Sequence, residues 1–566
     1  MQEINITSGI HGKVLWGRCL SYALGYALFA SLCSCGGGSP TSTAASPTSS
    51  GGSSSSPQSG QVSVSLSPSA VTVQSGQEQP FLASVSGTND TSVQWKASVG
   101  VIDASGVYTA PQTTTEISDV VTATSDAQPS VVATSHVTVE PSTSSPPPPA
   151  STSIPTTFFS ISGSSGMLFG VPWPKVQVGG FRLWDTQTGW EQLNPQSGVY
   201  SWQTFDMWLE KFEANSVDAT YTFGRVPQWA SSKPNDHSCR FGPGSCDPPD
   251  DLNSDGSGSD DHWRTFVTAI ANHSKNSAHG HVKRWEMWNE PQNSFYWSGT
   301  TAQLVRMTRD AWLILKAVDP DATVVSPGTG LVYDASHWTS DYLANGALPY
   351  LDVIAFHGYV EGKCPDTEPD TSVLGSEIAN FRAMLASHGA SDKPLWDTES
   401  SWGNTSDTCF TDADSQAAFV AQSYLLHWSN QIDRYYWYQW DNPGFGTLWK
   451  QSGGSGQLLK PGMAYEQVYD WLVGASLTSP CAVSGTLWSC TLSRPAGYQG
   501  LILWDTSQGC GGKTCTTVPF SVDASYVTYR DLNGNANAVT GQSVPVGAKP
   551  ILVQNQPFSS ALRKAY

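Results

Sequence analysis

Positive charge is scarce in this sequence of 566 residues. Charged residues make up 13 % of the chain, and 28 lysines and arginines stand against 47 aspartates and glutamates, which gives a formal net charge of −19. An acidic chain repels phosphate groups, so the composition argues against nucleic acid and against an anionic membrane surface as partners. The length exceeds what a single hydrophobic core organises, and several domains are expected.

The N-terminal apolar run, Cys19 to Leu32, is too short to cross a bilayer as a helix. It follows Lys13 and Arg18, an arrangement typical of a signal peptide. The next residues, Leu32-Cys33-Ser34-Cys35, resemble a bacterial lipobox with Cys35 as the lipidated residue. We therefore expect a signal peptide over residues 1–34, export to the cell surface or periplasm, and membrane attachment only through a lipid anchor. An ordinary signal peptide cleaved nearby is the alternative.

No Cys-X-X-Cys pair and no closely spaced histidines accompany the cysteines that follow Cys35, which argues against a metal site there. No metal and no other cofactor is predicted. Eight of the eleven cysteines follow Cys35, and an even number in an exported chain indicates disulfides. Proximity along the chain predicts four pairs: Cys239 with Cys246, Cys364 with Cys409, Cys481 with Cys490, and Cys510 with Cys515.

Two linkers divide the N-terminal part of the chain. Residues 35–60 are almost entirely small or polar, which predicts a flexible tether. Residues 141–157 contain four consecutive prolines and should be stiffer, close to polyproline II.

Residues 61–140, between these linkers, are predicted to form a small β-sandwich. Short alternating runs such as Val62 to Leu66 are separated by turn residues, as in such folds. The sequence around Trp95 and Gly106 to Pro111 resembles bacterial immunoglobulin-like repeats, so an immunoglobulin-like domain is expected.

Residues 158–476 alternate strand patterns with amphipathic helices such as Ala302 to Ala317. Seven such units in this length predict a (β/α)8 TIM barrel with its site at the carboxyl ends of the strands. A doubly wound sheet is the alternative, but no Gly-rich phosphate loop follows the first strand. The strand candidates are Gly180 to Trp184, Asp218 to Phe223, Arg284 to Asn289, Ala322 to Ser326, Asp352 to His357, Pro394 to Glu399 and Arg434 to Trp440.

The last part, residues 477–566, returns to a β pattern and is predicted to be a second β-sandwich. The extended segment Thr157 to Ser162 is expected to join the sheet of this C-terminal sandwich.

Two of these strand candidates each deliver a glutamate at the carboxyl end. Glu290 stands in Trp-Glu-Met-Trp-Asn-Glu-Pro, where Pro291 should push it into extended geometry. Glu399 ends the run Leu-Trp-Asp-Thr-Glu, in which strand alternation would place Leu395, Asp397 and Glu399 on one face. Two carboxyl groups among tryptophans are what cleavage of a glycosidic bond requires.

These motifs, with His357-Gly358-Tyr359 between them, resemble the retaining glycoside hydrolases of clan A, most closely family 39, over residues 158–555. The resemblance implies that Glu290 is the acid/base, with a raised pKa, and that Glu399 is the ionised nucleophile. Further roles follow from the same resemblance. Asn289 would bind the sugar 2-hydroxyl if the chain twists at the strand end, His357 and Tyr359 would orient Glu399, Arg182 would lie near the nucleophile, and Trp437, with Trp440 as a substitute, would form the platform under the sugar.

The function predicted is therefore retaining hydrolysis of β-linked glycosides or polysaccharides, with a carbohydrate as the partner. A non-catalytic surface carbohydrate-binding protein or adhesin is one alternative, and an inverting hydrolase or transglycosylase is another. The run Asp251 to Gly256 has the alternating oxygens of a calcium loop, but its twelfth position is His262 where a glutamate would be expected. A helix-capping turn is the preferred interpretation of that run.

Overall fold

The computed structural model describes residues 61–74, 78–111, 116–140, 153–331, 335–360, 362–364, 367–452, 455–510 and 515–557. The predicted signal peptide, Cys35, the linker 35–60 and most of the linker 141–157 lie outside these ranges. Within them, no helix combines the length and the apolar character needed to cross a membrane.

Eight parallel strands form the barrel in the order β14-β13-β12-β11-β10-β17-β16-β15. The two outer strands of this order meet through a parallel bridge between Val325 and Val353, supported by a 2.9 Å hydrogen bond from the Ser326 amide to the Val353 carbonyl. The fold is thus a (β/α)8 TIM barrel. Its strands are β10 (Phe159–Ser162), β11 (Gly180–Leu183), β12 (Asp218–Thr222), β13 (Arg284–Glu286), β14 (Thr323–Val325), β15 (Ile354–Phe356), β16 (Leu395–Ser400) and β17 (Arg434–Trp437).

The strand β10 corrects one prediction. Thr157 to Ser162 was expected to join the C-terminal sheet, but Phe159–Ser162 pairs in parallel with β11 on one side and with β17 on the other. All four residues of β10 are buried, as a strand covered on both faces requires. This strand completes the eight, next to the seven that the sequence pattern predicted.

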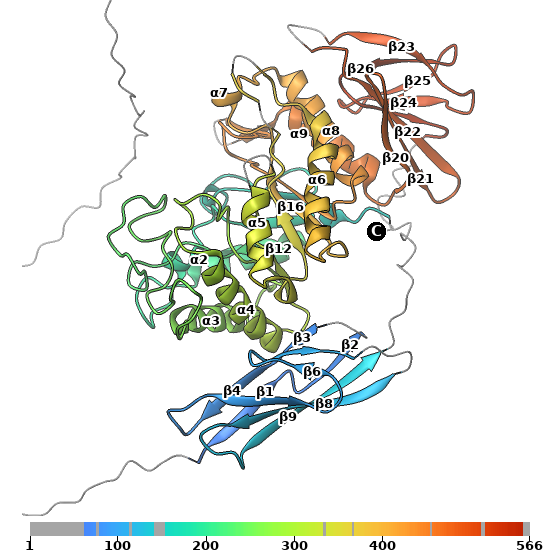
Figure 1. Ribbon diagram of the computed structural model, residues 1–566. Coiled ribbons are helices and arrows are strands. Elements are labelled where there is room, and N and C mark those ends of the chain that lie inside the picture. Colours follow the sequence, from blue (N-terminus) through green and yellow to red (C-terminus); the bar gives the residue numbers. More distant parts are fainter. Residues whose placement is uncertain are drawn as a thin grey trace, which may run out of the picture. The chain divides into compact units, whose positions relative to one another are not determined.

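Helices connect most of the strands and lie outside the ring that the strands form (Figure 1). The helix after β13, α4, begins at a capping box in which the Thr300 hydroxyl accepts from the Gln303 amide and the Gln303 side chain accepts from the Thr300 amide. The helices are α1 (Trp190–Leu193), α2 (Gln203–Asn215), α3 (Asp261–Lys275), α4 (Thr301–Val318), α5 (Ala335–Ala344), α6 (Leu374–Ser387), α7 (Thr405–Thr408), α8 (Ala413–Ser429) and α9 (Lys460–Leu472).

Strand alternation divides each barrel strand between an inner and an outer face. A compact apolar cluster, Val325, Val353, Ala355, Trp396 and Tyr436, is contributed by β14, β15, β16, β17 and the segment before β15. These four strands are neighbours in the ring, and the Tyr436 hydroxyl also lies 2.7 Å from the Thr220 hydroxyl of β12, three strands away, a contact that only the barrel interior allows. Residues two positions further along these strands therefore also point inward, toward the carboxyl ends.

Two further β-rich regions are described. The C-terminal one contains an antiparallel sheet of order β20-β21-β22-β27-β24-β25 and a pair β23-β26, with the hairpin β18-β19 preceding α9. Its strands are β18 (Trp449–Ser452), β19 (Ser455–Leu458), β20 (Ser476–Ser484), β21 (Leu487–Arg494), β22 (Tyr498–Asp505), β23 (Thr517–Ser521), β24 (Thr528–Arg530), β25 (Ala536–Ala538), β26 (Ser543–Gly547) and β27 (Ile551–Gln554).

The N-terminal region contains the sheets β2-β9-β8-β5, β1-β4 and β3-β7-β6 around a small apolar core that includes Tyr108 and Val121. It is β-rich, as predicted, and its immunoglobulin-like identity stays a prediction. Its strands are β1 (Ser63–Ser67), β2 (Ala70–Gln74), β3 (Glu78–Pro80), β4 (Leu82–Ser86), β5 (Val93–Ala97), β6 (Val101–Ile102), β7 (Val107–Thr109), β8 (Ile117–Ser125) and β9 (Val132–Glu140).

The four predicted cysteine pairs are present as disulfides. Cys239 is bonded to Cys246, Cys364 to Cys409, Cys481 to Cys490, and Cys510 to Cys515.

Candidate active site

Arg182 is the centre of a buried network at the carboxyl end of the barrel. It occupies the inner face of β11 and is fully buried, so its guanidinium must be satisfied by protein groups. Its Nε donates to Glu286 Oε2 at 2.7 Å, Nη1 to Glu399 Oε2 at 2.7 Å, and Nη2 to Asn289 Oδ1 at 2.8 Å. Burial lowers the pKa of Arg182, but Glu286 and Glu399 raise it by more, and the group stays charged. One side chain therefore links β11, β13 and β16.

Glu286 was not singled out from the sequence. It precedes Glu290 by four residues in the same motif, and its carboxylate is fully buried. Oε2 accepts from Arg182 Nε and from the Thr222 hydroxyl at 2.5 Å. The sequence did offer an indication, because Glu286 is two positions from Arg284 on the same strand, and alternate residues of a barrel strand face the interior.

Glu290 lies just beyond the end of β13. The prediction of extended geometry is wrong, because Glu290 has φ +42° and lies in the left-handed region. Its Oε1 is 3.0 Å from His357 Nδ1, and its Oε2 accepts from the side-chain amide of Asn293, Nδ2, at 3.1 Å. The chain thus changes direction at the end of β13, which is the condition that the predicted role of Asn289 set. This change of direction also lets Asn289 reach Arg182.

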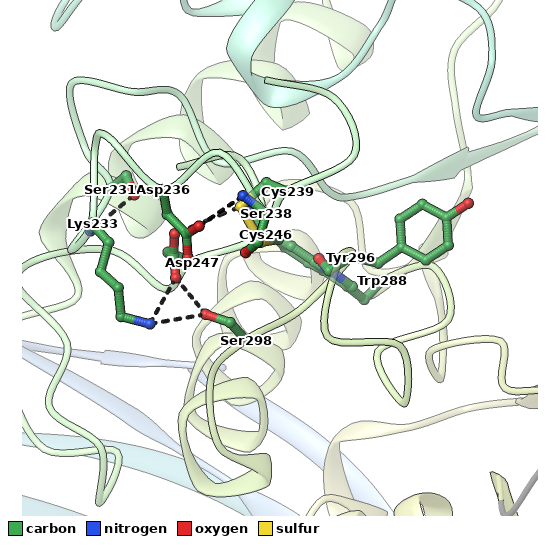
Figure 2. The surroundings of a disulfide bond; sticks show 10 residues. All are labelled: Ser231, Lys233, Asp236, Ser238, Cys239, Cys246, Asp247, Trp288, Tyr296 and Ser298. Carbon is green, nitrogen blue, oxygen red and sulfur yellow. Dashed lines mark hydrogen bonds and ion pairs between the residues drawn. A yellow bond between two sulfur atoms is a disulfide. The ribbon is translucent and has the colours of Figure 1, made fainter. Parts of the chain in front are cut away.

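The turn that follows Glu290 is fixed by backbone hydrogen bonds. The backbone N–H of Asn293 donates to the Glu290 carbonyl at 3.0 Å, and the backbone N–H of Tyr296 donates to the Asn293 backbone carbonyl at 2.8 Å. The Trp288 indole then donates to the Tyr296 carbonyl at 3.0 Å (Figure 2). Asn293, which sequence reasoning missed, is thereby held where its side chain meets Glu290.

Glu399 reaches the barrel interior through a bulge in β16. Asp397 pairs with Tyr435 and Ser400 with Trp437, so two residues, Thr398 and Glu399, face a single residue of β17. The extra residue shifts the alternation by one position. The prediction that Leu395, Asp397 and Glu399 share one face is therefore wrong.

Two donors hold the Glu399 carboxylate. The Tyr359 hydroxyl donates to Oε1 at 3.0 Å, and Arg182 Nη1 donates to Oε2 at 2.7 Å. His357, in contrast, bonds to Glu290. Of the two residues that the resemblance assigned to orienting Glu399, only Tyr359 is hydrogen-bonded to it.

The two glutamates and His357 converge on one point. One ligand-type atom from each of Glu290, His357 and Glu399 lies within 4.8 Å of the corresponding atom of the other two. The side chains of Glu290 and Glu399 are 19 % and 11 % exposed, whereas that of His357 is fully buried. Both glutamate side chains thus reach solvent, whereas the imidazole between them does not.

Burial and charge act differently on the three groups. Burial raises the pKa of Glu290, but the hydrogen bond and charge of His357 outweigh burial, and this pKa lies below its ordinary value. Burial raises the pKa of Glu399 above its ordinary value, because His357 and Arg182 offset burial only in part. Burial lowers the pKa of His357, but Glu399 and Glu290 raise it above its ordinary value. The expected raised pKa of Glu290 is therefore wrong, and the neighbouring imidazole is the cause.

Trp437 does not offer a platform to a sugar. Its ring is fully buried and packs against Trp402 and Phe419, and its indole nitrogen donates to the Gly446 carbonyl at 2.6 Å. Trp440, the predicted substitute, is also fully buried. The physical reason is strand alternation: Tyr436 points inward, so its neighbour Trp437 points toward the surrounding helices.

Tyr438 takes the next inward position on this chain segment. Its hydroxyl donates to Asp185 Oδ2 at 2.5 Å, and its ring lies edge-on to Phe445 with centroids 5.2 Å apart. Phe445 in turn lies 5.8 Å from the ring of Tyr359. Burial raises the pKa of Tyr438, and Asp185 and Glu399 raise it further, which places this hydroxyl within electrostatic reach of the site. Counting parity from Tyr436 would have identified Tyr438 from the sequence.

A disulfide organises the loop between β12 and α3 (Figure 2). Cys239 and Cys246 close this loop, and the Cys246 carbonyl accepts from the Ser298 amide at 2.8 Å. The adjacent Asp247 is fully buried and accepts from Lys233 Nζ at 3.0 Å and from the Ser298 hydroxyl. These bonds join the loop after β12 to the loop that follows Glu290.

The run Asp251 to Gly256 forms a turn that caps α3. Asp251 Oδ2 accepts from the His262 amide in the first turn of α3 at 3.1 Å and from the Ser259 hydroxyl at 3.0 Å. The helix-capping interpretation is therefore confirmed. Asp250, Asp251 and His262 also have ligand-type atoms within 4.8 Å of one another, and their Asp250 Oδ1 and His262 Nε2 atoms are 3.1 Å apart.

Comparison with protein-family models and with curated proteins finds no match. Solved structures do match. A family 39 glycoside hydrolase from Bacteroides cellulosilyticus WH2 aligns with a TM-score of 0.52 at 16 % identity, over 87 % of this chain and 99 % of that chain. A GH39 beta-xylosidase from Caulobacter crescentus aligns with a TM-score of 0.51 at 15 % identity, over 72 % of this chain and 98 % of that chain. At these identities the likeness establishes the fold, and the chain is similar in fold to glycoside hydrolases of family 39.

Proposed function

We propose that this protein is a retaining glycoside hydrolase in which Glu399 is the nucleophile and Glu290 is the acid/base. The observation that carries the proposal is the approach of the two carboxylates, with oxygen atoms within 4.8 Å, at the carboxyl ends of β13 and β16. Retaining enzymes hold the two groups about 5 to 5.5 Å apart, whereas inverting enzymes leave room for a water and hold them about 6.5 to 9.5 Å apart.

The nucleophile is assigned to Glu399 because of its donors. Arg182 and Tyr359 each hold one carboxylate oxygen, and both contacts favour the ionised form that attacks the anomeric carbon. Burial raises the pKa of Glu399 and leaves its carboxylate poorly solvated, which makes the ionised form more reactive. Attack forms a bond from a Glu399 oxygen to the anomeric carbon while the leaving oxygen departs with its electron pair.

Glu290 serves the leaving oxygen together with His357. Protonation of that oxygen needs a proton at Glu290, and the 3.0 Å contact between Glu290 Oε1 and His357 Nδ1 provides a path for it. The raised pKa of His357 and the lowered pKa of Glu290 describe a pair that holds one proton on the imidazole side. Transfer to Glu290 and then to the leaving oxygen completes the first step. In the second step the oxygen of a water bonds to the anomeric carbon, Glu290 removes a proton from that water, and the bond to Glu399 breaks and restores its carboxylate.

Asn289 and Tyr438 complete the contacts to the sugar. Asn289 Oδ1 accepts from Arg182, so the amide N–H groups are the donors left for a sugar 2-hydroxyl. Tyr438, held by Asp185, takes the place beside the sugar that the sequence had assigned to Trp437.

The substrate class is a β-linked glycoside or polysaccharide, with β-xylosides first in the panel because two of the structural relatives are named beta-xylosidases. The test is hydrolysis of aryl β-glycosides, with the anomer of the first product followed by NMR. Retention, and labelling of Glu399 by a 2-fluoro glycoside, are expected. An inverted product or a label on another residue would overturn the mechanism.

We also propose that the protein is exported and tethered to a membrane through a lipid on Cys35. The support is the sequence Leu32 to Cys35 and the small, polar residues that follow it. Cys35→Ala should move the protein from the membrane fraction to the soluble fraction, and unchanged membrane association would refute the anchor.

A further inference from the structure

The bulge that turns Glu399 inward leaves a backbone donor to be satisfied. Thr398 and Glu399 together face one residue of β17, and such an extra residue loses its place in the ladder of strand hydrogen bonds. An unpaired buried amide is costly, so another acceptor is needed close by.

Asp397 supplies that acceptor. Its Oδ1 accepts from the Glu399 amide at 3.2 Å and from the Gly358 amide at 3.2 Å. The second amide lies between His357 and Tyr359, which contact the two glutamates. One carboxylate oxygen thus fixes the end of β16, which carries Glu399, and the segment after β15, which carries His357 and Tyr359.

His427 of α8 holds the other oxygen of Asp397. Its Nε2 is 2.7 Å from Asp397 Oδ2, and its Nδ1 is 2.7 Å from the Ser423 carbonyl. A carbonyl only accepts, so Nδ1 carries a proton, and the contact to Asp397 contains one bridging proton. The ring is stacked on Tyr435 with centroids 3.9 Å apart and an interplanar angle of 8°, and Asp397 and His427 are both fully buried.

We propose that Asp397, held by His427, is a positioning residue that keeps Glu399 in its inward orientation; this inference rests on the proposed function. The pair faces away from the substrate and acts only through the backbone. The space is closely fitted, since a Cβ added to Gly358 would lie 2.3 Å from Asp397 Oδ2. What matters on this account is an acceptor at Oδ1, not the negative charge.

The chain allows that distinction to be tested at one position. In Asp397→Asn, Oδ1 still accepts from both amides, and the new amide group donates to His427 Nε2, so every hydrogen bond is retained without the charge. Asp397→Leu keeps the approximate shape but removes the acceptor. For the full-length protein acting on an aryl β-glycoside, Asp397→Leu should lower kcat about 100-fold with little change in KM, as expected for a misplaced nucleophile. Asp397→Asn should stay within about threefold of the wild type.

The rate of labelling of Glu399 by a 2-fluoro glycoside should fall in parallel with kcat for the Leu variant and stay unchanged for the Asn variant. A folded Leu variant with wild-type kcat, or an Asn variant as slow as the Leu variant, would overturn the positioning role. If Asp397→Leu does not fold, Asp397→Ser, whose shorter side chain ends before the two amides, gives the same comparison. Failure of the proposed function is distinguishable, because then the wild type itself would show no turnover and no label on Glu399.

Discussion

The active-site carboxyl groups, Glu290 and Glu399, can be compared with a second pair, Asp260 and Asp310, which lies on the outer side of the barrel strands, between α3 and α4. In the active site both side chains reach solvent, and His357 and Arg182 supply positive charge. In the outer pair Asp260 is fully buried and Asp310 is 4 % exposed.

The two pairs solve the repulsion between their carboxyl groups differently. Burial and the neighbouring Asp310 raise the pKa of Asp260 to about 9, so Asp260 keeps its proton and hydrogen-bonds to Asp310. As a carboxylate, neither of its oxygens would have a donor. The comparison teaches that closeness of two carboxyl groups does not define a hydrolase site. Cations lie beside both pairs, since Arg306 Nε donates to Asp310 Oδ2 at 2.9 Å, so what distinguishes the active site is that both of its carboxyl side chains reach solvent.

Removal of Glu399 should have the largest effect. Glu399→Ala deletes the attacking group, so kcat on aryl β-glycosides should fall by about 10⁴-fold or more. Initial-rate kinetics would measure this, with Glu210→Ala, an exposed glutamate on α2, as the matched control. Turnover within tenfold of the wild type would exclude Glu399 as the nucleophile.

Glu290→Ala should distinguish the roles of the two glutamates. Loss of acid assistance should lower kcat/KM by about 10²- to 10⁴-fold for substrates with poor leaving groups and much less for activated aryl leaving groups. The measurement is a series of aryl glycosides ordered by leaving-group pKa. An equal loss across that series would contradict the acid/base assignment.

Arg182→Met should move the pH dependence of activity. Arg182 lowers the pKa of Glu399 against the effect of burial, so its removal raises that pKa further. Because attack needs ionised Glu399, the acid limb of kcat/KM should shift to higher pH. Glu286 would also lose its buried partner, at a cost of about 3 to 5 kcal/mol of stability.

The control is Arg434→Met, which removes a buried arginine at the amino end of β17 that pairs with Asp218. It should lower the melting temperature without moving the acid limb. An unshifted limb in a folded Arg182→Met protein would argue against electrostatic support of Glu399.

Asp260→Asn should affect stability and leave kcat unchanged. The pKa of Asp260 is about 9 in the folded protein and about 3.9 in an unfolded chain. Between these values the unfolded chain releases a proton that the folded protein retains, so the stability that is fully present below pH 4 is lost as pH rises toward 9. The variant should therefore be more stable than the wild type by a few kcal/mol at pH 8 and by less at pH 5.

Thermal unfolding across pH would measure this difference. Asp321→Asn, whose parent side chain is 81 % exposed, is the control and should leave the pH dependence as in the wild type. A gain in stability that does not grow with pH would contradict the shared-proton interpretation.

Local sequence determined much of this architecture. Alternating and amphipathic patterns predicted seven of the eight barrel strands, because they depend on neighbours along the chain. Pairing each cysteine with the next one predicted the four disulfides, whose partners are 5 to 45 residues apart. The motif around Glu290 and the run ending in Glu399 located the two carboxylates. Arg182 and Tyr359 were expected near Glu399, and both are hydrogen-bonded to it.

Only the tertiary structure decided where these residues point and what surrounds them. Sequence alternation assumes an unbroken strand and therefore placed Asp397 and Glu399 on one face, whereas the bulge before Ser400 puts them on opposite faces. Because Tyr436 points inward, its neighbour Trp437 is buried on the other side of the strand. β10 was misassigned because a short buried strand carries no pattern that names its partner. The pKa of Glu290 depended on His357, which is 67 residues away in sequence and 3.0 Å away in space. Electrostatic effects follow distance through the fold, and distance between remote residues is fixed only when the barrel closes.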